Sequence, residues 1–131
     1  MLSSTMHVRG VLTPTNTARI TPDIKSRIRT EFREHNIHWV MNSSLGEDGI
    51  IELDSHLDTH EVRHSAMYFI NRLRDLIIAE DIIDLKLEGN LTIVGYKWET
   101  NEPVILQVLV RNGNVAFQDG HVQWERESVI R

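Results

Sequence analysis

The segment from residue 58 to 80 most constrains the fold, because it is the longest stretch of this 131-residue chain with a helical apolar period. Asp58, with Glu61 three residues later, matches a capping box, so we expect the helix to begin at Asp58 and to end near Glu80. A helix with a single apolar face must bury that face against another layer. Its apolar residues share one face: Val62, Ala66, Phe69, Ile70, Leu73, Leu76 and Ile77.

An earlier segment predicts a second helix. Thr21-Pro22-Asp23 combines a hydroxyl N-cap, a proline at the first helical position and an acidic first turn. Ile24, Ile28 and Phe32 then recur every four residues, which gives a narrow apolar stripe that ends near His35.

The remaining segments predict strands. The strands expected from alternation and from bounding turns are 7–12, 37–41, 50–53, 91–98, 104–110, 115–118 and 121–125. The polar stretch 42–49 suggests a hairpin between the second and third of them, and Asn112-Gly113 is a strong hairpin turn. Two one-faced helices require one sheet to cover, so we predict an α+β two-layer sandwich. It has a mostly antiparallel sheet of about six to seven strands with both helices on one face, in the order β-α-β-β-α-β-β-β-β. The crossover through the first helix would add one parallel pair.

Length and composition limit the function classes. The chain has the size of a single domain, residues 1–131, with about 1–5 and 126–131 expected to be flexible. It contains no cysteine, which indicates a reducing cytoplasm. Its net charge of −5 argues against direct nucleic-acid binding. No apolar run reaches the roughly 20 residues that a membrane helix needs, so we expect a soluble cytoplasmic protein.

One motif indicates catalysis. His60-Glu61-Val62-Arg63-His64 matches H-E-x-x-H, in which His60 and His64 would bind zinc and Glu61 would act on the bound water. On a helix, however, both histidines lie nearly opposite the apolar face, and Glu61 is already needed by the helix start. Adventitious metal binding by His56, His60 and His64 is a further alternative. We therefore expect no cofactor, and keep a zinc-dependent hydrolase as the alternative.

Two further groups could bind a ligand or partner. Lys25, Arg29 and Arg33 form a basic stripe suited to an anion, although such a stripe is usually a solvated face paired with nearby acids. Trp98 and Trp124 lie on expected strands, where tryptophan usually belongs to the core. If both lay on the face away from the helices, they would form a patch for a partner or an oligomer.

The chain also resembles a group of proteins in its layout. Gly10-Val-Leu-Thr-Pro14, the central amphipathic helix and the closing hairpins with Asn112, Asn114 and Val115 resemble small uncharacterised α+β proteins of bacteriophages and bacteria. The resemblance implies a phage accessory protein of no known activity and transfers no catalytic residue.

These observations favour a small non-enzymatic binding protein. We expect it to act, as a phage-encoded inhibitor would, by binding a host protein. The alternative within the same class is a homo-oligomer that sequesters a small anionic ligand. An acidic surface around residues 47–61 could mimic nucleic acid or meet a basic surface of a host protein.

Overall fold

The computed structural model describes residues 4–16, 20–41, 49–97 and 102–120. The helices are α1 (Pro22–Glu34) and α2 (Val62–Ile77), with short 3₁₀ turns η1 (His38–Val40) and η2 (Ile83–Leu85). The strands are β1 (Ser4–Pro14), β2 (Ile51–Thr59), β3 (Leu87–Lys97), β4 (Glu102–Arg111) and β5 (Asn114–Asp119).

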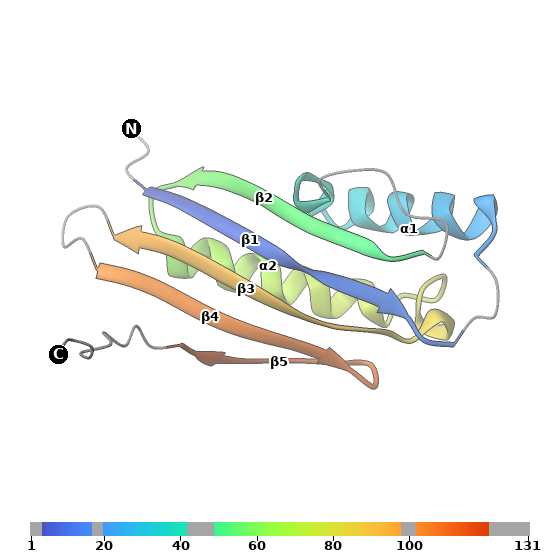
Figure 1. The fold of residues 1–131 in the computed structure, drawn as a ribbon. Helices are drawn as coiled ribbons and strands as arrows, with labels where there is room; N and C mark the ends of the chain where they lie inside the picture. The colour runs from blue at the N-terminus through green and yellow to red at the C-terminus, as the bar shows by residue number, and fades with distance from the viewer. Residues whose placement is uncertain (1–3, 17–19, 42–48, 98–101, 121–131) are drawn as a thin grey trace, which may run out of the picture.

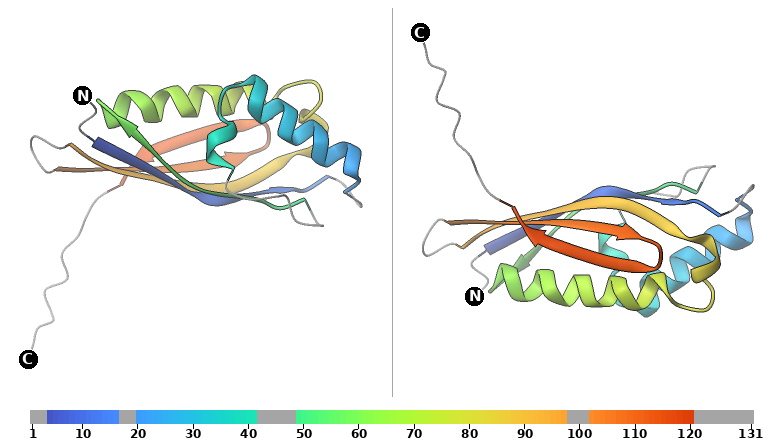
Figure 2. Two further views of the ribbon diagram at one scale, coloured as in Figure 1. Left: turned by 90° about the horizontal axis from the view of Figure 1, so that it is seen from above. Right: turned by 90° about the horizontal axis from the view of Figure 1, so that it is seen from below.

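The strands form one sheet in the order β2-β1-β3-β4-β5, and each neighbouring pair is antiparallel. Figure 1 shows the long central strands β1 and β3, and Figure 2 shows both helices on one side of the sheet. The α+β sandwich is therefore confirmed. The predicted number of strands was too high, since the described sheet has five. The predicted parallel pair was also wrong, because η1 lies between α1 and β2 and the chain enters β2 antiparallel to β1.

The core lies between the sheet and the helices. Inward residues of the strands, such as Met6 and Leu106, are fully buried together with Phe32 of α1 and Phe69 of α2. Alternate residues of the strands contribute to this core, as the period of two requires. Within the described ranges, no helix has the length and apolar character needed to cross a bilayer.

The predicted strand 37–41 is wrong. Asn36, with φ of 60°, ends α1 in a Schellman motif, in which the Ile37 amide donates to the Phe32 carbonyl (3.0 Å). The chain then forms η1, where Ile37 and Val40, three residues apart, are both buried. Of the described residues 37–41, only Met41 pairs with a strand, through a single bridge to Leu53, so the expected hairpin is absent from the described residues.

The second helix begins later than predicted. Asp58 belongs to β2, where its carboxylate accepts a hydrogen bond from the Thr5 hydroxyl (3.0 Å). The strand extends this far because Ile51, Leu53 and Leu57 follow a period of two that continues to the buried Thr59. The cap of α2 is Glu61, and the helix ends at Ile77 instead of Glu80.

The two ends of the sheet extend the predicted strands. Ser4 and Thr5, which lie within the segment expected to be flexible, belong to β1. The Asn112-Gly113 hairpin is confirmed, with both residues at positive φ (53° and 76°). The predicted strand 121–125 and the predicted flexible segment 126–131 lie outside the described residues.

Helix α2 protects the edge formed by β5. Arg63 pairs with Asp119 (2.6 Å), and Arg74 donates to the Val115 carbonyl (3.3 Å) while its guanidinium lies over the Phe117 ring (5.8 Å). Charged side chains on an edge strand discourage pairing with a further strand. This edge is therefore poorly suited to extending the sheet.

Candidate functional site

The HEVRH motif does not lie on one helix. His60 forms a bend before α2, and Glu61 is the N-cap, whose carboxylate accepts from the Arg63 amide (2.9 Å). His64 is the third residue of the helix, and both histidines are exposed. Two zinc ligands separated by one helical turn require both to be helical. The structure instead gives Glu61 the structural role of a helix cap.

Side chains around the motif also serve the start of the helix. The hydroxyls of Thr59 and Ser65 share a short hydrogen bond (2.6 Å), and the Glu61 amide donates to the Thr59 hydroxyl (3.3 Å). His56, the third histidine of this spacing, lies on β2. Among the residues that the structure describes, no three His, Asp or Glu side chains are gathered as a metal site needs.

The basic stripe lies on α1. Arg29 and Arg33 are exposed and Lys25 is half-buried, and none of the three forms an ion pair with a described residue. Glu31, one of the acids near the stripe, has its carboxylate 3.5 Å from His35 Nδ1. A hollow of about 590 Å³ beside α1 contains none of the stripe residues and is lined by Asp23, Ser26, Arg27, Thr30, Glu31 and Asp81. Its acids outnumber its one arginine, so it does not suit an anion.

One of the three tryptophans lies within the described residues. Trp39 lies in η1 and packs half-buried against Phe69, with ring centroids 6.0 Å apart. Trp98 and Trp124, the two candidates for a partner surface, lie outside the described residues.

The surface with the most distinctive composition is the side of the sheet opposite the helices, which we call the open face (Figure 2). Among the described elements, neither helix packs on it. Because the strands pair in register, its side chains form rows across the sheet. One row contains Asp54, Arg9, Thr92, Gln107 and Gln118, and the next contains Glu52, Val11, Asn90, Leu109 and Ala116.

One half of the open face, over β2 and β1, is polar. The Asp54 carboxylate lies 2.8 Å from His7 Nε2 and 3.6 Å from Arg9 Nε. The rings of His7 and His56 meet edge to face at 6.2 Å. Asp58 also belongs to this half and is exposed, so the outermost strand carries carboxylates at alternate positions.

The other half, over β3 and β4, holds most of the large apolar side chains of the open face, beside the polar Asn90, Thr92 and Gln107, and we call it the apolar half. Tyr96 and Leu109 are 53% and 41% exposed, and Val11 on β1 is 41% exposed. Val94 and Ile105 lie opposite each other in the register and are only half-buried. Large apolar side chains that share one exposed face are typical of a binding surface.

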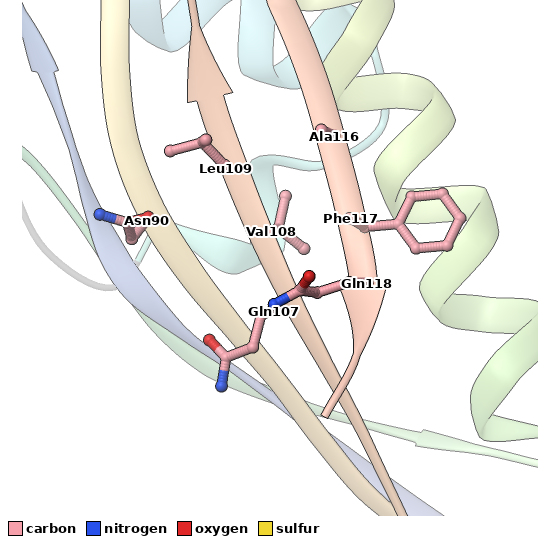
Figure 3. A pocket seen from close by; sticks show the side chains of 7 residues that line it. All are labelled: Asn90, Gln107, Val108, Leu109, Ala116, Phe117 and Gln118. Atoms are coloured by element: carbon pink, nitrogen blue, oxygen red, sulfur yellow. The ribbon is translucent and has the colours of Figure 1, made fainter. Parts of the chain in front are cut away.

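The apolar half continues into a shallow hollow of about 440 Å³. Figure 3 shows it over β4 and β5, with Gln107 and Leu109 on one strand and Ala116 and Gln118 on the other. The small side chain of Ala116, directly opposite Leu109, leaves space beside that leucine. Three amide side chains at its border, those of Asn90, Gln107 and Gln118, can donate and accept hydrogen bonds. The hollow could therefore accept a protruding side chain.

Sequence reasoning missed this surface, although the pattern of β4 indicates its apolar half. Strand β4 has apolar residues at both parities, with Val104, Leu106, Val108 and Val110 inward and Ile105 and Leu109 outward. The polar half depends on the pairing of β1 with β2, which the chain order alone does not give.

Comparisons with known proteins provide no relative. No family model, curated protein or solved structure matches this chain.

Proposed function

We propose that this chain is a non-enzymatic binding protein that binds another protein through its open face. The observation that carries the proposal is the composition of β4, in which Ile105 and Leu109 point away from the core. A sheet with one solvated face usually alternates apolar and polar residues, and apolar residues at both parities are typical of strands covered on both sides. A protein partner would supply the second cover.

The contrast with β1 supports this reasoning. Its outward residues Thr5, His7 and Arg9 are polar, as a solvated face requires, and only Val11 departs from the pattern. The apolar character is therefore concentrated on the β3–β4 side of the open face instead of being spread over it. A compact apolar region with a polar border is the usual composition of a protein interface.

The other candidate functions have less support. His60 lies outside α2 and Glu61 caps that helix, so the zinc-hydrolase alternative lacks the paired helical ligands of its motif. The hollow beside α1 contains no residue of the basic stripe and has more acids than bases, so it gives the anionic-ligand alternative no support. A protein-binding role, such as inhibition of a host protein, agrees best with the open face.

Replacing Leu109 with glutamate should remove binding through this face without unfolding the chain, because Leu109 is already 41% exposed. The matched control is Tyr68→Glu on α2, where the side chain is 45% exposed and lies beneath Arg72. Immobilised wild-type chain would be incubated with a lysate of its native cells and with untagged chain. We expect the immobilised wild-type chain to retain a protein, either a second copy or a different protein. The immobilised Leu109→Glu variant should no longer retain it, whereas the Tyr68→Glu variant should retain it as the wild type does. Equal retention by all three chains would contradict the proposal.

A further inference from the structure

We infer that the protein accepted by the open face is a second copy of this chain, in a twofold dimer with β3 on the symmetry axis. The inference rests on the proposed function, since it names the occupant of the same surface. In such a dimer the two sheets pack face to face and the two helical layers lie outside.

The size of the open face suits a dimer. Five strands about 4.8 Å apart, paired over about nine residues, give a face about 24 Å wide and 30 Å long, or roughly 700 Å². Stable interfaces bury about 800 Å² on each partner. The open face alone therefore supplies nearly the whole area that a stable dimer needs.

Two rows of the open face place compatible side chains opposite each other about β3, although the row of Leu109 also places Glu52 opposite Ala116. A twofold axis parallel to β3 exchanges β1 with β4 and β2 with β5, because β3 is the central strand. In the row of Leu109, this places Val11 opposite Leu109 of the second copy. In the adjacent row it places the Asp54 carboxylate opposite the Gln118 amide, which can donate to it.

The axis itself passes through side chains that can pair with their own copies. The outward residues of β3 are Glu88, Asn90, Thr92, Val94 and Tyr96, and of these only Glu88, near the start of the strand, is charged. Amides and hydroxyls can donate to and accept from the same group on a second copy, and valine or tyrosine pairs bury apolar surface. Glu88 is the one outward residue of β3 that would meet a like charge on the axis.

A twofold axis across the strands fits less well. It would place β2 over its own copy and bring Glu52, Asp54 and Asp58 against the same three carboxylates. Like charges opposite each other in an interface are strongly unfavourable. The axis parallel to β3 brings only Glu88 of that strand against its own copy, so charge still favours it over the axis across the strands.

Site-specific crosslinking tests this arrangement. The natural chain has no cysteine, so Thr92→Cys introduces a single thiol on the inferred axis. Sheets that pack about 10 Å apart hold the two Cα atoms beyond the roughly 7 Å limit of a disulfide, so a short bis-maleimide is the suitable reagent. We expect the full-length Thr92→Cys chain to crosslink efficiently to a dimer, and light scattering to report the mass of two chains.

Two control positions separate the possible outcomes. Gln118→Cys on β5 and Asp75→Cys on the exposed side of α2 should crosslink weakly, because both lie far from the inferred axis. Efficient crosslinking at Gln118→Cys would place the axis across the strands. Efficient crosslinking at Asp75→Cys would place the interface on the helices. Either result would overturn the inference. A monomer at every concentration would also overturn it. If that monomer still lost a different captured protein through Leu109→Glu, the proposed function would stand without the dimer.

Discussion

Replacing Phe69 with alanine should lower the free energy of unfolding by about 3–5 kcal/mol. Its ring is fully buried on the face of α2 that contacts the sheet, and it packs against Trp39 at a centroid distance of 6.0 Å. Truncation removes the transfer free energy of the ring and leaves a cavity that rigid strands on one side cannot fill. A domain is typically stable by only 5–15 kcal/mol, so the variant should be close to unfolding at 25 °C. Urea denaturation followed by circular dichroism measures the loss.

The neighbouring residue gives a matched control. Tyr68 is also aromatic and helical, but it is 45% exposed, so Tyr68→Ala should cost less than about 1 kcal/mol. Equal losses for the two variants would mean that the helix does not pack in the described orientation.

Replacing Gly89 with alanine should cost about 1–3 kcal/mol, although it adds only one methyl group. A Cβ at this position would lie 1.9 Å from the Val11 carbonyl oxygen and 3.1 Å from the Leu12 Cα. Both contacts are with the backbone of β1, the strand paired with β3, so no side chain can rotate to make space. Separation of the two strands would weaken the central pairing of the sheet. The loss is measured by thermal unfolding at low protein concentration.

Glu88→Ala provides the comparison on the same strand. Glu88 is half-buried beside Gly89 in sequence, and its truncation removes atoms instead of adding them. We expect a change within about 0.5 kcal/mol. A Gly89→Ala variant as stable as Glu88→Ala would contradict the close approach of β1 and β3.

The parts of the fold that the sequence predicts are those with a long and regular pattern. Each helix was predicted from one apolar stripe, and Phe32 and Phe69 of those stripes are indeed fully buried. The Thr21 cap also forms as predicted, with its hydroxyl accepting from the Ile24 amide (3.2 Å). The Asn112-Gly113 turn was equally specific, because few residues tolerate two successive positive φ angles.

Short apolar runs did not decide between a strand and a helical turn. Residues 37–41 are compatible with a strand by composition, and the structure places their apolar side chains on a 3₁₀ turn because Asn36 reverses the chain first. The period of two in β2 was obscured by Ser55, a polar residue at an inward position. Asp58 was consequently predicted to be a helix cap, whereas in the structure it continues strand β2.

The candidate site could not be predicted for a different reason. HEVRH is a local pattern, and its interpretation depended on where α2 begins, which shifts by a few residues with the competing strand. The open face is non-local, since Val11 and Leu109 share a row only through the pairings of β1, β3 and β4. The order in which strands pair is decided by tertiary packing, and the apolar alternation along a single strand does not predict it.

The chain contains two tyrosines, one on each layer, and their reactivity tests the central claim most directly. Tyr96 lies on the open face and is 53% exposed, and Tyr68 lies on α2 and is 45% exposed. Hydroxyl-radical modification of both would be measured by mass spectrometry over a series of protein concentrations. If the open face binds a second copy, the modification of Tyr96 should fall several-fold as concentration rises while that of Tyr68 stays constant. A constant Tyr96 modification, or protection of Tyr68 instead, would contradict the account.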